Sequence, residues 1–198
     1  NSDISSESGT GYFSTSWMGA KISPDMANIS VINPNNNIAW GAAYWQYFEN
    51  IEDITSSSSA LGIEKVIFVE TTTDNGPLLV ELGENKLTKG DKVVVRLIIK
   101  TDRDVQYVQV KDMRATAFES ASSESGYTYE GGLWFYKNIT NLGNEFFIKQ
   151  LNKGIYIIEY PLFVTQSGNF TDGIATIQSM YAPEFGSNSK GRRIIVSD

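Results

Sequence analysis

The chain has 198 residues, of which 41% are hydrophobic and 12% aromatic, a composition typical of a folded globular protein with one large or two small domains. Its 23 acidic and 16 basic residues give a net charge of −7, and because nucleic acids and anionic membrane surfaces need clustered positive charge, the scattered basic residues exclude both as partners. Cysteine and histidine are absent, which excludes disulfides, thiol and serine–histidine catalysis and most zinc sites.

The same composition limits catalysis and membrane insertion. An enzyme built from this chain would depend on carboxylates, lysine or tyrosine alone. No apolar run approaches the roughly 20 residues of a membrane-spanning helix, and no signal peptide is visible. We therefore expect no enzyme, no catalytic residues, no cofactor, no metal ion and no insertion into a membrane.

Residues 1–57 form the first of two predicted parts. The polar opening, from Asn1 to Thr10, indicates the start of a piece cut from a longer chain. Apolar residues then alternate, and we predict a strand over residues 39–48 rather than a short helix over 42–54. The serine run at 56–59 predicts a loop. Because this part is too short to fold alone, we expect residues 1–57 to hold remnant strands of a preceding domain.

Residues 58–198 form the second predicted part, a self-sufficient series of strands. β-Branched and aromatic residues predict strands at 93–100, 107–111 and 154–164. Glycine, proline and asparagine predict turns at 74–77, 89–91, 131–132, 152–154 and 167–169. Short strands with frequent turns favour an antiparallel sandwich. The predicted fold class is all-β: an immunoglobulin- or fibronectin-like β-sandwich of about ten strands with extra N-terminal strands.

The end of the chain predicts a strand, a turn and a final strand. Residues 173–186 carry an aromatic to the end of a strand and then a proline, and residues 190–196 pass from basic to apolar. We expect Pro183 to fix the turn and Tyr181 to pack against the sandwich. Arg192 or Arg193 is expected to pair with Glu184.

This ending resembles a known family. Met180-Tyr181-Ala182-Pro183-Glu184, followed by arginine and an Ile-Val strand, is similar to the closing strands of the last domain of bacterial alpha-2-macroglobulin-like proteins of the Bacteroidetes type. Two departures are the absence of a proline before Phe118-Glu119 and of a cysteine-containing thioester motif. Other segments that resemble the family, in its order, lie at 38–48, 61–69, 87–97, 102–112, 118–119, 153–156 and 168–170.

The resemblance implies a role in peptidase inhibition. Family members are large envelope proteins that are cleaved by a peptidase, change shape and trap it. It implies that this chain is a non-catalytic carboxy-terminal scaffold and docking region, periplasmic or associated with the bacterial cell envelope. Its implied partners are the preceding domains and, through the full-length protein, peptidases. The alternative hypothesis is an extracellular adhesion or carbohydrate-binding module.

Acidic residues offer weak candidates for a metal site or for hydrolysis. Asp102, Asp104 and Asp112, with Asp91 nearby in sequence, lack the spacing of a calcium loop, and Arg103 supplies a counter-charge, so we favour a solvated hairpin tip. Hydrolysis by paired carboxylates is the least supported hypothesis, and its candidates are Glu119, Glu124, Glu130 and Glu159.

An aromatic run after Gly131-Gly132 offers a candidate binding surface. In a strand, Trp134 and Tyr136 share one face and Phe135 takes the other. Exposed aromatic rings can stack on sugars. One of the two faces is expected to belong to the core, and we favour packing over carbohydrate binding for this run.

Overall fold

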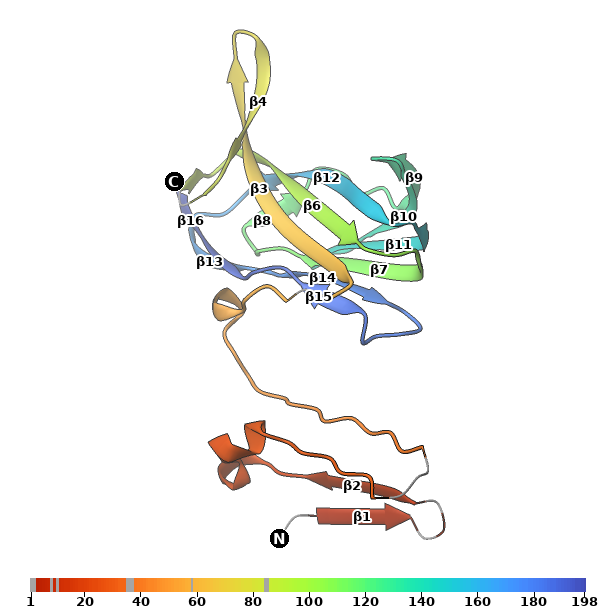
Figure 1. Cartoon of the computed structure of the whole chain (residues 1–198). Coiled ribbons are helices and arrows are strands. Elements are labelled where there is room, and N and C mark those ends of the chain that lie inside the picture. The colour runs from red at the N-terminus through yellow and green to blue at the C-terminus, as the bar shows by residue number, and fades with distance from the viewer. Residues whose placement is uncertain (1–2, 8, 10, 35–37, 58, 84–85) are drawn as a thin grey trace. The chain divides into compact units, whose positions relative to one another are not determined.

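The computed structural model describes residues 3–7, 9, 11–34, 38–57, 59–83 and 86–198. The chain divides into two compact units, Asn1–Gln46 and Tyr47–Asp198, and Figure 1 traces both. Sixteen strands and three short 3-10 helices are present in the described residues. The predicted all-β class and the extra N-terminal strands are confirmed, although the number of strands exceeds the prediction because several are only two or three residues long.

The described residues of the N-terminal unit form one hairpin and two short helices. Strand β1 (Asp3–Glu7) pairs antiparallel with β2 (Tyr12–Ser16). Helices η1 (Gly19–Lys21) and η2 (Pro24–Ala27) follow, with Pro24 at the first helical position, where its missing N–H costs nothing.

The predicted strand at residues 39–48 is wrong. Residues 38–50 form neither strand nor helix, and Trp40 and Phe48 are exposed. A strand is stable only when its N–H and C=O groups bond to a neighbouring strand, and no described strand pairs with this segment. Alternating apolar residues therefore did not suffice to form a strand here.

The C-terminal unit is a sandwich whose two larger sheets are antiparallel. A helix, η3 (Ile51–Asp53), precedes its first strand. Its strands are β3 (Leu61–Thr73), β4 (Gly76–Glu81), β5 (Leu87–Thr88), β6 (Lys92–Thr101), β7 (Val105–Met113), β8 (Phe118–Ser120), β9 (Gly126–Glu130), β10 (Leu133–Ile139), β11 (Gly143–Leu151), β12 (Gly154–Val164), β13 (Gly168–Asp172), β14 (Ala175–Ser179), β15 (Gly186–Asn188) and β16 (Arg192–Ser197).

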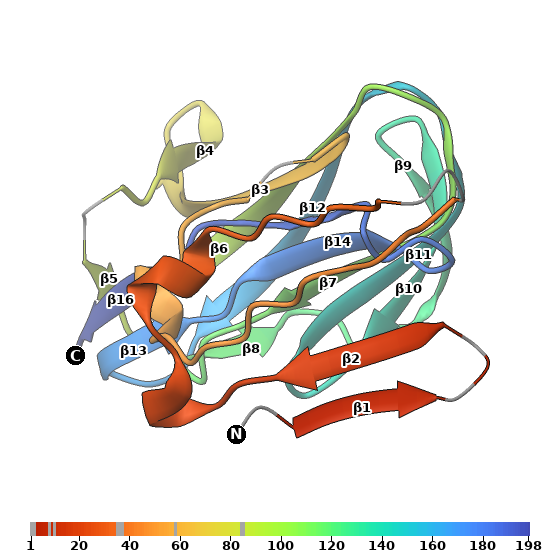
Figure 2. The same ribbon diagram turned by 60° about the horizontal axis from the view of Figure 1, so that its bottom comes forward.

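The strands described in this unit form three sheets. A six-stranded sheet has the order β15-β14-β7-β11-β10-β9, and a five-stranded sheet has the order β4-β3-β6-β12-β8. Strands β14, β7, β11 and β10 run side by side in Figure 2. A third sheet, β13-β16-β5, includes the parallel pair β16 and β5. The strands predicted at 93–100, 107–111 and 154–164 correspond to β6, β7 and β12.

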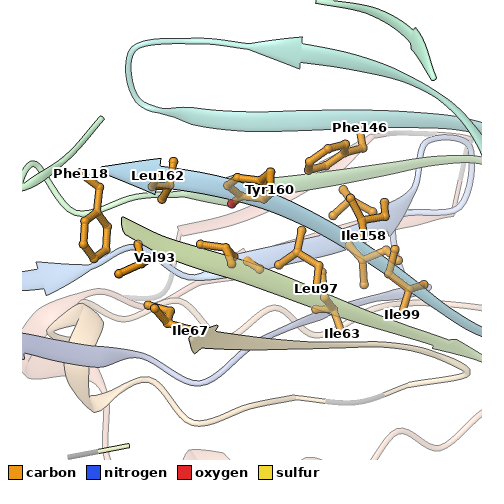
Figure 3. Packing of buried hydrophobic residues seen from close by; sticks show 14 of the residues in the cluster. Ile63, Ile67, Val93, Leu97, Ile99, Phe118, Phe146, Ile158, Tyr160 and Leu162 are labelled. Atoms are coloured by element: carbon orange, nitrogen blue, oxygen red, sulfur yellow. The ribbon is translucent and has the colours of Figure 1, made fainter. Parts of the chain in front are cut away.

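The core lies between the two larger sheets. Apolar side chains at every second position of β3, β6 and β12 pack against those of β7, β10 and β11. The ring centroids of Phe146 and Phe135 lie 5.5 Å apart in an edge-to-face contact, and Phe146 also contacts Tyr160. Figure 3 shows Phe146 and Tyr160 together with the aliphatic residues of β3, β6 and β12.

The closing turn has the predicted course but different contacts. Ala182 C=O accepts a hydrogen bond from Phe185 N–H at 2.9 Å across the turn that holds Pro183. Tyr181 packs on the sandwich through an edge-to-face contact with Tyr107 of β7, with ring centroids 5.1 Å apart, but its side chain stays exposed. Arg193 pairs with Glu52 rather than with Glu184.

Segment 51–57 is fixed to the sandwich by its own contacts. Glu52 accepts hydrogen bonds from Thr171 and from Arg193, and Ile54 C=O accepts one from Gly191 N–H at 2.9 Å. Ser57 forms a bridge with Asn188. The domain boundary expected at residue 57 stays a prediction.

Candidate functional site

Four aromatic side chains lie on one exposed face of the hairpin β9–β10. We call Tyr127, Tyr129, Trp134 and Tyr136 the aromatic face. Trp134 is 65%, Tyr129 60%, Tyr127 81% and Tyr136 38% exposed. Leu133 and Phe135, on the other side of β10, are buried. One face is core, as predicted, but the candidate pair Trp134 and Tyr136 lies on the opposite one.

The register of the hairpin pairs these rings. Trp134 lies opposite Tyr129, and Tyr136 lies opposite Tyr127. Each pair has ring centroids 5.2 Å apart, a spacing at which aromatic pairs attract one another. Since β9 is the edge strand of its sheet, no further strand covers it within the described residues. The arrangement presents ring surfaces and phenolic hydroxyls together on one exposed face.

The turn that holds the hairpin depends on two glycines. Gly131 and Gly132 have φ angles of 58° and 80°, the left-handed values of a type I′ turn, which glycine adopts without strain. A Cβ at Gly131 would also clash with the carbonyl oxygen of Ile157, whereas one at Gly132 would meet nothing within 4 Å. Tyr127 and Tyr129 were missed from the sequence, although their alternation in β9 was a usable signal.

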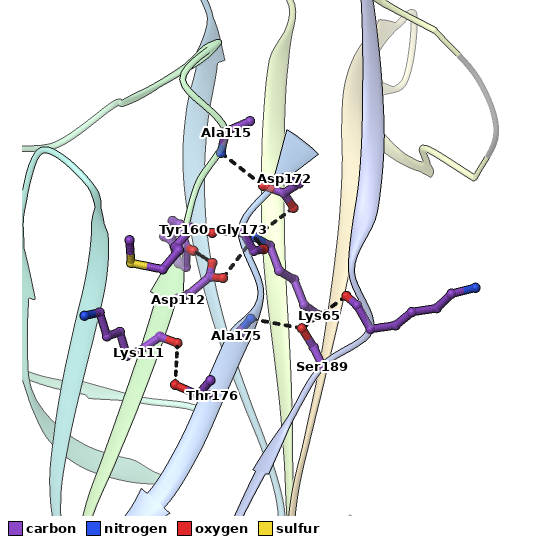
Figure 4. Close-up of polar contacts among 12 residues, drawn as sticks. Lys65, Lys111, Asp112, Ala115, Tyr160, Asp172, Gly173, Ala175, Thr176 and Ser189 are labelled. Atoms are coloured by element: carbon purple, nitrogen blue, oxygen red, sulfur yellow. Dashed lines mark hydrogen bonds and ion pairs between the residues drawn. The ribbon is translucent and has the colours of Figure 1, made fainter. Parts of the chain in front are cut away.

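The second feature is a group of charged side chains in the core. Lys65 of β3, Asp112 of β7, Tyr160 of β12 and Asp172 at the end of β13 meet between the sheets, and we call them the charge cluster (Figure 4). Lys65 Nζ lies 2.9 Å from Asp112 Oδ1 and 2.8 Å from Asp172 Oδ2. The side chains of Lys65, Asp112 and Asp172 are 4%, 0% and 3% exposed.

Backbone groups complete the coordination of the charge cluster. Lys65 Nζ donates to the carbonyl oxygens of Met113 and Gly173, each at 2.9 Å. Asp172 Oδ1 accepts a hydrogen bond from Ala115 N–H at 3.1 Å. Tyr160 donates its hydroxyl proton to Asp112. The cluster thereby ties the first strand of the sandwich to β7 and to the turn after β13.

Burial and charge shift the pKa values of this cluster. Burial raises the pKa of Asp112 above its ordinary value, against the opposing effect of the Lys65 ammonium. For Lys65, burial acts to lower the pKa, but the two carboxylates outweigh it and raise the pKa. Burial and then the Asp112 carboxylate raise the pKa of Tyr160 well above its ordinary value. Burial and charge thus raise the pKa values of both Lys65 and Asp112.

The carboxylates considered as a calcium site have separate partners. Asp102 pairs with Arg103 at 2.7 Å, and this hydrogen bond lowers the pKa of Asp102. Asp104 accepts a hydrogen bond from Lys153 N–H at 2.7 Å. These two residues lie in the exposed turn, as predicted, but Asp112 does not: it is buried against Lys65. Its alternation with Val108 and Val110 places it on the core face of β7.

The glutamates considered for hydrolysis are also accounted for. Glu130 accepts a hydrogen bond from Glu159 N–H at 3.0 Å, and Glu159 forms an ion pair with Arg96. Glu119 and Glu124 are exposed. In the described part of the chain, no group of three or more acidic residues is arranged to hold a metal ion.

The fold of this chain is similar to that of domains in solved alpha-2-macroglobulin structures. Alpha-2-macroglobulins of Salmonella (mutant Y1175G) and of Escherichia coli (activated by porcine elastase) superpose on 73% of this chain with TM-scores of 0.57 and 0.58 and sequence identities of 18% and 15%. A fragment of the E. coli protein from domain MG7 to the C-terminus matches 72% with a TM-score of 0.55 and 15% identity. The fold is therefore that of a macroglobulin-type β-sandwich.

The family follows from the sequence. The model of the bacterial alpha-2-macroglobulin MG10 domain matches residues 61–184, more than half of the chain, and the chain belongs to this family. A curated relative, circularly permutated Ras protein 2 of Dictyostelium discoideum, is 24% identical over 184 residues, which are 88% of this chain.

The compared proteins are much longer than this chain. The chain spans 5% of the Dictyostelium relative and 10%, 14% and 24% of the three solved structures. None of the helices in the described residues has the length and apolar content needed to cross a membrane.

Proposed function

We propose that this chain is a non-catalytic scaffold and docking region of an alpha-2-macroglobulin-like peptidase inhibitor of the bacterial envelope. The observation that carries the proposal is the match of residues 61–184 to the MG10 domain family. A peptidase that cleaves the full-length protein would be enclosed by it, and this region would hold neighbouring domains in place. Its partners would be the preceding domains and, through the full-length protein, peptidases.

The structure supports a scaffold in two respects. The sheets share a continuous apolar core, so the unit 47–198 can act as one rigid piece. The charge cluster pairs its titratable groups with one another, and their side chains are buried in the sandwich.

The trap is tested on the full-length protein with a peptidase that cleaves it. We expect the peptidase to lose activity on large protein substrates and to retain activity on small peptides, because only small molecules reach an enclosed active site. The isolated chain should neither hydrolyse substrates nor inhibit the peptidase. Full-length protein that lacks these 198 residues is the matched control and should not protect protein substrates.

A second candidate function is carbohydrate binding at the aromatic face. The specific observation is that four aromatic rings lie on one exposed side of β9–β10. Trp and Tyr are amphipathic, and their rings can stack on sugars while hydroxyls form hydrogen bonds. The occupant would be a polysaccharide of the cell surface, which would make the chain an adhesion module.

Glycan-array binding and titration with a polysaccharide test this second function. Trp134→Ala should abolish binding while the circular dichroism spectrum stays that of the folded chain. Tyr181→Ala is the matched control, since Tyr181 is also exposed but lies outside the aromatic face. Absence of binding at millimolar concentration, or equal loss in both variants, would contradict a site at this face.

A further inference from the structure

The charge cluster places an amine against two carboxyl groups inside a β-sandwich. Lys65 Nζ lies within 2.9 Å of oxygens from both Asp112 and Asp172, and the three side chains are almost fully shielded from water. Lys65 comes from the five-stranded sheet and Asp112 from the six-stranded sheet. A bond between these two residues would join the two sheets.

The balance of charge in the cluster favours an extra proton. An ammonium has three N–H groups, and Lys65 directs two bonds of regular geometry to the carbonyls of Met113 and Gly173. Asp112 Oδ1 is buried 2.9 Å from Nζ, yet no well-aligned hydrogen bond reaches it from the described residues. Two carboxylates beside one ammonium would leave a net negative charge, which is costly in the core. Protonation of Asp112 removes this charge.

We propose that Lys65 and Asp112 form an intramolecular isopeptide bond, an amide between Nζ of Lys65 and Cγ of Asp112, with the release of one water molecule. A protonated carboxyl group is open to attack by an amine, whereas a carboxylate is not. Burial keeps water, which would compete or reverse the reaction, away from the reacting atoms. The proposal concerns the folding of this domain and does not depend on peptidase inhibition.

The reaction balances with the groups of the cluster alone. Asp172, with an oxygen 2.8 Å from Nζ, takes one proton from the ammonium. The nitrogen lone pair then attacks Cγ of protonated Asp112, and the C–N bond forms. Asp172 returns its proton to Oδ1, the C–Oδ1 bond breaks, and water leaves. Asp172 takes the second proton from the nitrogen, so the products are an amide, water and neutral Asp172.

Four neighbouring groups support this reaction by position. The hydroxyl of Tyr160 donates to Asp112, at the oxygen Oδ2 that gains negative charge in the tetrahedral intermediate, and such donors lower the barrier to acyl transfer. Ala115 N–H fixes Oδ1 of Asp172 at 3.1 Å, which leaves its Oδ2 facing Nζ. The two carbonyls on Lys65 hold the nitrogen near its target. Proximity of this kind replaces a collision between free groups.

The intact mass of the full 198-residue chain tests the proposal. We expect a mass lower than that of the sequence by one water molecule. Trypsin should fail to cleave after Lys65, and a branched peptide should contain Lys65 joined to Asp112. Lys65→Arg, which keeps the positive charge but has no nucleophilic amine, should retain the full mass. Asp172→Asn should also stay unlinked, and Tyr160→Phe should link more slowly, by roughly 100-fold.

The controls distinguish the isopeptide bond from another reaction that also removes one water molecule. Asp172 precedes Gly173, and cyclisation of an aspartate onto the next amide also removes one water. That product would persist in Lys65→Arg and leave trypsin cleavage at Lys65 of the wild-type chain intact; this result overturns the proposal. A wild-type chain that keeps its full sequence mass after folding and long incubation also overturns it and leaves the charge cluster as ion pairs only.

Discussion

The charge cluster and the aromatic face reverse the usual placement of residues in one domain. Lys65, Asp112 and Asp172 are buried, although charged side chains are seldom buried unless paired. The aromatic face exposes Trp134 and its neighbours, although such rings usually supply core and interface area. Both regions use the same alternation of strand residues, in one case toward the core and in the other toward solvent.

The difference between the two regions lies in where their interactions are completed. Every charge in the cluster meets a partner from another strand of the chain, so its contribution is to the fold. The ring pairs of the aromatic face lie within its own hairpin, and much of its apolar surface is exposed to water. A buried polar group without a partner is costly, whereas an exposed ring is tolerated. The first region therefore concerns stability, and the second leaves an aromatic surface exposed to solvent.

Loss of the cation in the charge cluster should produce the largest effect. Lys65→Met leaves two carboxyl groups buried beside an apolar chain, and breaking a buried ion pair in this way costs about 3–5 kcal/mol. The same variant cannot form the proposed amide with Asp112, so in a linked chain the loss of the covalent bond adds to this cost. Lys100→Met is the matched control, since Lys100 and Glu64 form an exposed pair at 3.6 Å, which is worth about 0–1 kcal/mol. Urea denaturation measures both. If the two variants lose equal stability, burial does not increase the contribution of the Lys65 ion pairs.

Substitutions at two adjacent residues of β10 should differ in their effect on stability, because one residue lies in the core and the other on the aromatic face. Phe135→Ala removes a buried ring that contacts Phe146, and the cavity should cost about 3–5 kcal/mol. Trp134→Ala, one position earlier on the exposed side, should change stability by about 0.5 kcal/mol or less. Thermal or urea unfolding of both variants checks this contrast. A large loss for Trp134→Ala would mean that the aromatic face supports the fold.

The alternation of residues predicted the strands and part of the core. It predicted β6, β7 and β12 because β-branched residues recur with period two and turn residues bound them. The same rule failed at residues 39–48, since alternation predicts a strand but not the neighbour that it needs. It also found Trp134, Phe135 and Tyr136 on alternate faces, but not which face is core, because that choice depends on the opposite sheet.

The charge cluster was not predicted, although each member occupies a core position. Lys65 follows Leu61 and Ile63, and Asp112 follows Val110, on the buried side of their strands. A charged residue in such a position needs a partner, but the partners come from β3, β7, β12 and β13. Contacts between strands so distant along the chain depend on the topology of the sheets, which local patterns do not contain.

The turn beneath the aromatic face offers a smaller effect with an internal control. An alanine in the left-handed region loses about 1–2 kcal/mol of stability. Gly131→Ala combines a left-handed φ of 58° with a clash against the carbonyl of Ile157, so its loss of stability should be larger. Gly132→Ala has the φ cost at 80° but open space and should stay within that range. Urea denaturation compares them. If the two alanines are equivalent, the close approach of Ile157 does not contribute.

The smallest effect should be pH-dependent and lie at segment 51–57. A backbone hydrogen bond and then Thr171 lower the pKa of Glu52 from its ordinary value of 4.5, and Arg193 adds to this shift. A lowered pKa in the folded state contributes stability above 4.5 that is lost as the pH falls through the folded value. The stability difference between wild type and Glu52→Gln should therefore be constant near neutral pH and shrink below 4.5. Urea denaturation across this pH range measures the stability difference. Glu184→Gln is the control, because Glu184 has no ion pair in the described residues, and it should show no such trend. If the difference for Glu52→Gln persists in acid, Glu52 contributes through packing rather than through its charge.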